Sequence, residues 1–323
     1  MARPNSKLTF LIPFLALALL LSACAAPSQP TQDVQPLRVA LLPVLDTLPF
    51  YIAAENGYFE DEGVQVEAVP VASPVERDQL MQAGEIDGML TEPGTVALFN
   101  QQDSLLMIVL TARAATDTGP VFRVLAAPNS DITTPSDLAG VPIGVSQNTI
   151  IEYVTERMLT ESGVAPDQII TESVPVIPER FQLLMQGELQ AATLPDPLAQ
   201  AALQAGAKLV VEDSQYPMYS VSVMAFTQDT IQNNGEAVRR FVAAWDKAVA
   251  DLNAAPEAYR TLFLEKVNVP ESVQDTYQIP AFPRGEVPSE ALWADVLTWL
   301  KDKGLVEADV VYSSSVTPEF LPR

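Results

Sequence analysis

An internal repeat is the feature of this chain that most limits its fold. The segment VPVASPVERDQLMQAGEID begins at Val69, and the segment VPVIPERFQLLMQGELQ begins at Val174. From Glu76 and Glu179 onward the two copies keep a constant offset of 103 residues. At this offset the identical pairs include Arg77/Arg180, Gln79/Gln182, Leu80/Leu183, Gly84/Gly187 and Glu85/Glu188. Such self-similarity predicts two copies of one supersecondary unit.

Each copy is predicted to form the succession strand, helix, strand, helix, strand. The run LRVALLPV, at 37–44, is apolar throughout, which is typical of a strand buried on both faces of a parallel sheet. In the first copy the further elements are expected at 50–59, 64–71, 74–83 and 86–90, and in the second copy at 141–146, 150–162, 169–176, from about 178, and 190–194. The alternation predicts the α/β class, with one open sheet in each of two lobes.

Several helix starts carry local signals. Ser73 and Glu76 flank Pro74 in a predicted capping box, and Thr149 with Glu152 forms another. Glu92-Pro93 and Asp196-Pro197 place an acidic residue before a proline, as at the start of a helix.

Two apolar stretches, at 120–128 and 219–227, suit crossover strands that join the lobes. Amphipathic helices are expected at 236–253 and 289–306, packed on the first lobe. The first lobe is therefore predicted to be discontinuous. The boundaries assign 37–121 and 224–323 to lobe one, and 122–223 to lobe two.

The first 36 residues have the layout of an export signal. Arg3 and Lys7 precede an apolar run that ends at Leu21, which is short for a membrane span; the alternative is an uncleaved anchor helix. The ending Leu-Ser-Ala-Cys resembles a bacterial lipobox, which implies removal of 1–23 and a lipid on Cys24, the chain's single cysteine. Residues 24–36, rich in Pro, Ser, Gln and Thr, are then expected to form a flexible tether.

Composition excludes several classes of chemistry. The chain has 18 basic and 41 acidic residues and no histidine. This balance argues against nucleic-acid binding, which depends on clustered Lys and Arg. Without histidine, and with one cysteine, neither a Ser-His-Asp triad nor a His- or thiolate-based metal site is expected. We predict no catalytic residue, no metal and no cofactor.

The predicted ligand site lies where the parallel strands end, because ligands of open α/β sheets bind beyond the carboxyl ends of the strands. Two such edges would face each other across the crossovers. The candidate contacts are the loop and helix-start residues at these ends, together with one cation near the hinge: Asp46, Thr47, Leu48, Thr91, Glu92, Arg113, Ser146, Gln147, Asn148, Thr149, Pro195 and Asp196.

Each of these candidates also has a purely structural interpretation. Thr149 could only cap its own helix, and Glu92 and Asp196 could be caps as well. Arg113 could grip an anionic group with two parallel hydrogen bonds, or pair with a carboxylate such as Asp117. The equivalent arginines of the repeat, Arg77 and Arg180, are predicted to have a structural role on their helices. Tyr216 and Tyr219 could stack on a ring or pack in the core.

Four segments together resemble a known family: LPFYIAAENGYFEDEGVQVE, AGEIDGML, SDLAGVPIGVS and WLKDKGLV with YSSSVTPEFLP. They are similar to the solute-binding lipoproteins of ABC importers that bind nitrate, sulfonates, taurine or thiamine-precursor pyrimidines. The resemblance runs from about Leu37 to the C-terminus and implies a type II periplasmic-binding-protein fold.

The resemblance implies a monomer that captures a small solute between two closing lobes and presents it to an ABC permease with its ATPase. It would be exported and lipid-anchored on the outer face of the cytoplasmic membrane. Two alternatives stay open: an enzyme on the same fold, with Asp46, Glu92 or Asp196 as its acids, and a ligand-sensing lipoprotein subunit. The identity and charge of the solute are not determined by these patterns.

Overall fold

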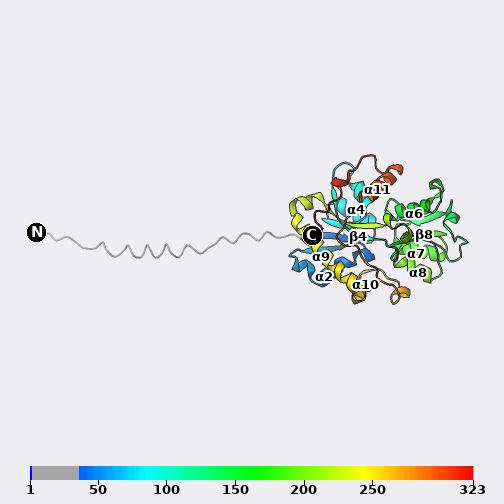
Figure 1. Cartoon of the computed structure of the whole chain (residues 1–323), viewed down its shortest axis with the longest axis horizontal. Helices are drawn as coiled ribbons and strands as arrows, with labels where there is room; N and C mark the ends of the chain where they lie inside the picture. Colours follow the sequence, from blue (N-terminus) through cyan, green and yellow to red (C-terminus); the bar gives the residue numbers. More distant parts are fainter. Residues whose placement is uncertain (2–35, 323) are drawn as a thin grey trace. The chain divides into compact units, whose positions relative to one another are not determined.

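The computed structural model describes residues 36–322 and, apart from these, Met1. The predictions for the signal peptide, for Cys24 and for most of the tether lie outside the described residues. Within 36–322 the chain forms two lobes, each built on a five-stranded sheet with flanking helices (Figure 1). The predicted α/β class with two lobes is confirmed.

The first sheet contains five strands, one of which returns from the other lobe. Its order is β2 (Val66–Pro70), β1 (Leu37–Leu41), β3 (Gly88–Thr91), β10 (Val221–Thr227) and β4 (Leu106–Ala114). Strand β1 pairs in parallel with β2 and β3, whereas β10 is antiparallel to both β3 and β4.

The second sheet repeats this arrangement. Its order is β7 (Ile170–Ser173), β6 (Pro142–Val145), β8 (Ala191–Pro195), β5 (Phe122–Ala126) and β9 (Lys208–Glu212). Strand β6 pairs in parallel with β7 and β8, and β5 is antiparallel to β8 and β9. Each sheet therefore has one antiparallel strand, the first that the chain forms after crossing from the other lobe. The return strand begins at Val221, three residues before the predicted lobe boundary.

Helices cover both sheets, and most lie close to their predicted positions. The first lobe contains α2 (Leu48–Glu55), α3 (Tyr58–Asp61), α4 (Pro74–Gln82) and α5 (Pro93–Phe99). The second contains α6 (Ile150–Glu161), α7 (Ile177–Gln186) and α8 (Leu198–Gln204). The single helix predicted at 50–59 is wrong: Gly57, with a φ of +73°, ends α2 and starts α3. Only glycine adopts this left-handed conformation at little cost.

The predicted capping boxes differ from the structure in the bond that each glutamate makes, and at Thr149 also in the backbone N–H that the cap accepts. Ser73 Oγ accepts from the N–H of Glu76, as expected, and Thr149 Oγ1 accepts from the N–H of Ile151. The carboxylates of Glu76 and Glu152, however, accept from the residue before the cap, Ala72 and Asn148 respectively. In both cases the glutamate side chain thus holds the backbone two residues before the first residue of the helix.

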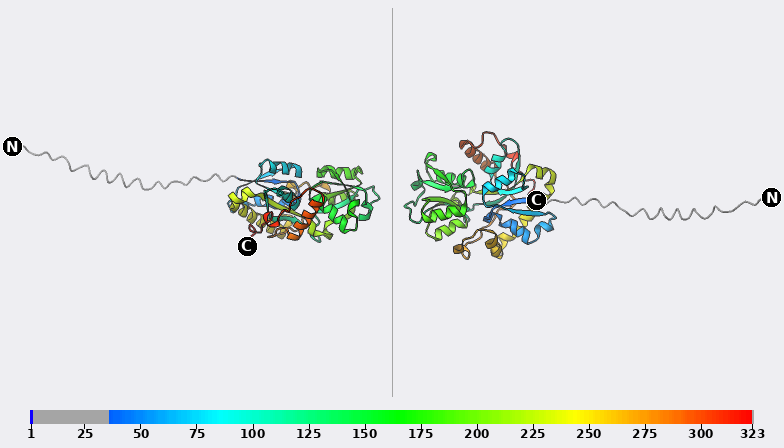
Figure 2. Two further views of the ribbon diagram at one scale, coloured as in Figure 1. Left: turned by 90° about the horizontal axis from the view of Figure 1, so that it is seen from above. Right: turned by 180° about the vertical axis from the view of Figure 1, so that it is seen from behind.

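The C-terminal helices pack against elements of the first lobe. They are α9 (Gln228–Ala254), α10 (Arg260–Lys266) and α11 (Glu290–Asp302). Helix α9 buries Phe241 and Trp245 in the same core as Phe50 and Phe59. Seen from behind in Figure 2, this helix and the early strands belong to the same lobe. Among the described residues, no helix is both long enough and apolar enough to span a bilayer.

Candidate functional site

A cavity lies between the lobes, where the carboxyl ends of the parallel strands of both sheets meet. The space inside its lining, with the open side included, is about 590 Å³. Residues of the first lobe that line it include Leu42, Asp46, Arg77, Leu90, Glu92 and Ser222; residues of the second include Phe122, Thr149, Ile150, Ile177, Pro195 and Asp196. Asp46 and Thr149 therefore flank one crevice, as the sequence predicts.

Asp46 is held from two directions at the floor of the cavity. It follows β1, and its side chain is buried apart from 11% of its surface. Its Oδ1 accepts from Arg113 Nη1 at 3.1 Å and its Oδ2 from Ser222 Oγ at 2.7 Å. Burial alone would lower the pKa of Arg113, but Tyr277 and Asp46 outweigh it and raise that pKa. Of the two interpretations of Arg113, the structure shows the ion pair with a carboxylate, but the partner is Asp46 and not Asp117, because β4 and β10 align Arg113 with Asp46.

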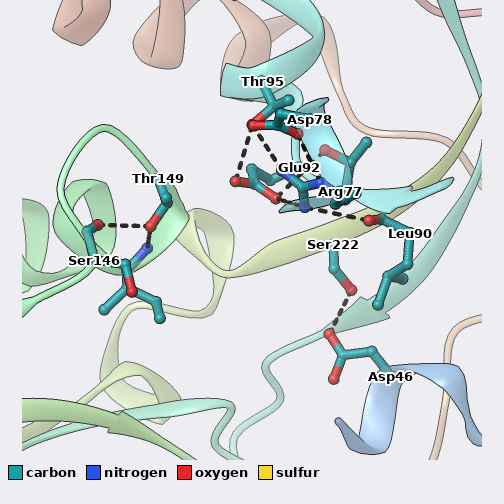
Figure 3. A network of polar contacts seen from close by, with 11 residues as sticks. Asp46, Arg77, Asp78, Leu90, Glu92, Thr95, Ser146, Thr149 and Ser222 are labelled. Atoms are coloured by element: carbon teal, nitrogen blue, oxygen red, sulfur yellow. Dashed lines mark hydrogen bonds and ion pairs between the residues drawn. The ribbon is translucent and has the colours of Figure 1, made fainter. Parts of the chain in front are cut away.

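Glu92 and Arg77 form a buried pair on the wall of the first lobe (Figure 3). Arg77 Nη1 donates to Glu92 Oε2 at 3.1 Å, and its Nε donates to Asp78 at 2.8 Å. Thr95 Oγ1 donates to Glu92 Oε1 at 3.0 Å. Burial would lower the pKa of Arg77, but the charges of Glu92 and Asp78 prevail and raise it. Glu92 precedes α5, but its side chain makes no capping bond, because it is committed to Arg77.

Asp196 follows β8 on the second lobe, one residue after the position that corresponds to Glu92 in the repeat. It pairs with Arg123 of β5, which also donates from Nε to Glu212 at 2.8 Å. Burial raises the pKa of Asp196 to about 6, and Arg123 counteracts only part of this. Helix α8 begins after Pro197, so Asp196 is a partner of Arg123 and not the predicted cap.

The start of α6 forms the opposite wall. Thr149 Oγ1 donates to the Ser146 carbonyl at 2.7 Å, which ties the helix to the end of β6. Ser146 Oγ accepts from Arg180 Nη1 at 3.0 Å, below the surface of the wall. Figure 3 shows Ser146 and Thr149 on one side of the space, with Asp46 and Glu92 on the other.

The other predicted contacts divide into two groups. Thr91 and Pro195 line the cavity, as Glu92 does, whereas the remaining residues lie around it. Thr47 and Leu48 are fully buried beneath Asp46, and Arg113 lies behind it. Gln147 is exposed and donates to Thr171, whereas Asn148 borders an adjoining depression. Ligand contact by any of these residues stays a prediction.

Sequence reasoning missed two polar residues of the lining. Arg77 was assigned a structural role on its helix, yet its guanidinium reaches the cavity beside Glu92. Ser222 lies on the return strand, and the sequence offered no signal that β10 passes beneath Asp46. For Arg77 a signal existed in the repeat. Arg77 and Arg180 each lie in the first turn of a helix, α4 or α7, that begins near the strand edge of its lobe.

Helices α6 and α11 connect the lobes beside the cavity. Tyr153 OH and Arg157 Nε both donate to Asp295, at 2.6 Å and 2.8 Å. Trp299 Nε1 donates to Glu156 at 2.6 Å. These contacts lie between α6 of the second lobe and α11 of the first, so they exist only while the lobes approach each other here.

The cavity offers carboxylates and hydroxyls but no metal site. Within 36–322, no group of three or more His, Cys, Asp or Glu side chains is arranged to hold a metal ion. The model of the family described as "NMT1/THI5 like" matches residues 45–259, which include both strand edges of the cavity. The chain belongs to the NMT1/THI5-like family. The predicted family resemblance is confirmed.

Curated relatives of this NMT1/THI5-like protein are binding proteins by name. The riboflavin-binding protein RibY of Chloroflexus aurantiacus is 23% identical over 357 aligned positions, which cover 98% of each chain. The formylaminopyrimidine-binding protein of Halalkalibacterium halodurans is 29% identical over 119 residues, 37% of this chain. That match spans only about a third (35%) of the relative's own length.

Solved structures share the fold of this NMT1/THI5-like protein. The periplasmic aliphatic sulphonate binding protein SsuA of Escherichia coli superposes with a TM-score of 0.72 at 18% identity, covering 87% of this chain and 92% of that one. The desulfurization enzyme DSZB superposes with a TM-score of 0.63 at 16% identity, covering 88% and 97%. At these identities the likeness extends to the fold alone.

Proposed function

We propose that this protein is the extracytoplasmic solute-binding component of an ABC import system. One observation carries the proposal: the two strand edges of the repeat face each other around a single cavity lined by both lobes. A small solute in this position touches both lobes at once. Closure on it excludes water, and buried polar contacts are stronger than exposed ones.

The relatives support the same function. Those that match over most of their length are named as a riboflavin-binding protein and as a periplasmic binding protein of an ABC transporter. A binding function also requires no reactive side chain. The carboxylates at the cavity are held by arginines, which suits a preformed binding surface.

The capture cycle follows from the two lobes. The solute enters while the lobes are apart, and closure brings α6 and α11 into contact through Asp295. The closed protein, acting as a monomer, then docks on a permease, which receives the solute. An enzyme of the same fold is the competing function, because DSZB shares the architecture.

Binding and turnover separate these functions. The soluble form, residues 25–323, is purified from its host and examined by native mass spectrometry for a bound solute. We expect one unchanged solute per chain. In X-ray scattering, we expect the solute-bound protein to have a smaller radius of gyration than the solute-free protein. Conversion of that solute to another compound would refute the binding function and favour an enzyme.

A matched pair of variants tests the site. Ile177→Trp fills the cavity from the start of α7 and is expected to abolish binding. Ile170→Trp places the same bulk on the outer strand β7, where the side chain is 43% exposed, and is expected to bind normally. Equal binding by both variants would show that the solute is held elsewhere.

Anchoring through a lipid on Cys24 belongs to the same proposal. Metabolic labelling with a radioactive fatty acid is expected to label the wild-type chain and not Cys24→Ala. The variant is expected in the soluble extracytoplasmic fraction instead of the membrane. Membrane association that survives the substitution would refute the lipid anchor without affecting the solute-binding function.

A further inference from the structure

A lysine at the end of α11 reaches from the first lobe to two carboxylates of the second. Lys303 Nζ donates to Glu152 Oε1 at 2.8 Å and to Glu156 Oε1 at 2.5 Å. The two glutamates are one turn apart on α6, so they lie on one face of that helix and a single ammonium group bridges both. Since α11 packs against α5 of the first lobe, whereas α6 packs against β5 and β8 of the second, both ion pairs connect the lobes.

Glu152 is the more deeply buried of the two carboxylates, with 3% of its side-chain surface exposed against 18% for Glu156. Its Oε1 also accepts from Thr171 Oγ1 of β7 at 2.8 Å, and its Oε2 accepts from the N–H of Asn148 at 2.7 Å. Among the described residues, Lys303 is the one cation within ion-pair distance of this carboxylate. The charge of Glu152 is therefore balanced from the other lobe, and only while the lobes are together.

The same carboxylate holds a wall of the cavity. Asn148 has a φ of +61°, a left-handed conformation that residues other than glycine rarely adopt. The bond from its N–H to Glu152 supports this conformation directly before Thr149, which caps α6 and lines the cavity. Lys303 itself is not part of the lining. It acts on the wall through Glu152.

An aromatic ring flanks the ammonium group without covering it. Lys303 Nζ lies 5.4 Å from the centroid of the Trp299 ring, whose Nε1 donates to Glu156 Oε2 at 2.6 Å. Burial would lower the pKa of Lys303, but its hydrogen bonds to the two glutamates outweigh this and raise that pKa, so the group is charged at neutral pH. Because 28% of the lysine side chain stays exposed, dissolved ions reach it.

We propose that Lys303 is a positioning residue of the solute site. With Glu152 and Glu156 it forms an interlobe lock, which holds the α6 wall against the first lobe and makes closure of the cavity depend on the ionic strength of the medium. This inference rests on the proposed solute-binding function and adds a form of regulation to it. Salt weakens the lock because dissolved ions screen charges that water reaches. A rise in ionic strength therefore favours the open form, from which a solute is released.

Two lysines of the same helix end provide a matched pair of variants. Lys303→Met keeps the aliphatic stem and removes the charge of the lock. Lys301→Met removes a charge two residues earlier, and the partner of Lys301 is Asp309 of the same C-terminal segment, which is 92% exposed. Both variants are studied as the solute-free soluble form, residues 25–323, by hydrogen exchange with mass spectrometry at pH 7.5.

The peptides that cover 147–156 give the decisive measurement. We expect these amides to exchange about fivefold faster or more in Lys303→Met than in wild type, because the wall opens more often. Lys301→Met is expected to exchange as the wild type does. In X-ray scattering, only Lys303→Met is expected to have a larger radius of gyration. Equal exchange of the two methionine variants would overturn the assignment of Lys303.

Salt and charge distinguish an ionic lock from simple packing. Raising NaCl from about 0.1 M to about 1 M shortens the screening length from about 10 Å to about 3 Å. We expect this change to accelerate exchange of the wild-type wall about twofold or more and to have little effect on Lys303→Met. Lys303→Arg keeps the positive charge and is expected to restore slow exchange. A wild-type wall insensitive to salt, or an arginine variant that behaves as Lys303→Met does, would count against the lock.

A second variant covers the case in which Lys303→Met folds poorly. Glu156→Gln removes the more exposed carboxylate of the lock and is expected to accelerate exchange of the wall about twofold or more. All these measurements use solute-free protein, so they separate failure of the inference from failure of the function. Unchanged exchange removes the lock and leaves the solute-binding function intact, whereas turnover of a bound compound defeats that function without affecting the ion pairs.

Discussion

The two arginines of the internal repeat are expected to respond in opposite ways to the same substitution. Arg77 and Arg180 occupy equivalent positions, and both are fully buried. Arg77 pairs with Glu92 and Asp78, but at the corresponding positions the second lobe has Pro195 and Phe181. Arg180 thus donates from Nη1 to Ser146 and to the Val174 carbonyl, without a counterion among residues 36–322.

The magnitudes follow from burial and charge. Arg77→Met leaves Glu92 without its cation in a dry environment, which costs about 3–5 kcal/mol of unfolding free energy. Burial lowers the pKa of Arg180 far below its ordinary value, to about 9. At about 1.4 kcal/mol per tenfold change in acidity, the charged group destabilises the native state by about 5 kcal/mol at neutral pH. Because the folded pKa is below the unfolded one, this penalty is complete below pH 9 and disappears as the pH rises from there to the ordinary pKa of arginine.

Arg180→Met removes that penalty and keeps the volume of the aliphatic stem, at the loss of two hydrogen bonds of about 1 kcal/mol each. We therefore expect it to be neutral or stabilising by up to about 3 kcal/mol. Urea denaturation at pH 7.5, followed by circular dichroism, measures both variants. As a control, adding Glu92→Gln to Arg77→Met is expected to restore part of the lost stability. Equal destabilisation by the two methionine variants would refute this account of the buried charge.

Three further results are expected. Solute affinity changes as the pH falls from 7.5 to 5, because Asp196 of the cavity lining, with a pKa of about 6, gains a proton and loses its negative charge. Calorimetry across this range would contradict the position of the site if affinity were constant. Asp295→Asn weakens the ion pair and hydrogen bond between α6 and α11, and is expected to lower solute affinity about fivefold, or about 1 kcal/mol. As a control, Asp246→Asn alters an ion pair within the first lobe and is expected to leave solute affinity unchanged in the same titrations. Gly88→Ala places a methyl group 2.6 Å from the ring of Phe226 and is expected to lower the free energy of unfolding by about 1–3 kcal/mol in urea denaturation. An unaltered midpoint of unfolding would show that the ring can move.

Local patterns predicted most of the architecture. Strands β1, β3, β6 and β8 are short apolar runs between helices. Such runs are typical of strands that are buried on both faces of a parallel sheet. The ends of these strands indicated where the cavity lies, since parallel strands finish at one edge. The break at Gly57 was missed because an isolated glycine is tolerated inside a helix, and only the turn into α3 demands its positive φ.

The partners of the charged side chains were much less predictable. Arg113 pairs with a residue 67 positions earlier, and Arg123 with one 73 positions later. Which strand lies beside which in the sheet determines both pairs. A local sequence window, in which Asp117 is the nearest carboxylate to Arg113, contains no information about that order.

The sequence by itself determined the repeated α/β unit, the two-lobed class and the strand edges that border the cavity, because periodicity, caps and prolines act over a few residues. Only the tertiary structure decided which groups face that cavity. It pairs Asp46, Glu92 and Asp196 of the lining with arginines from other elements, brings Arg77 to the lining beside Glu92, and leaves Arg180 buried away from it. The physical reason is that side-chain orientation at a buried site depends on desolvation and on partners brought from distant segments, and these exist only once both sheets have formed.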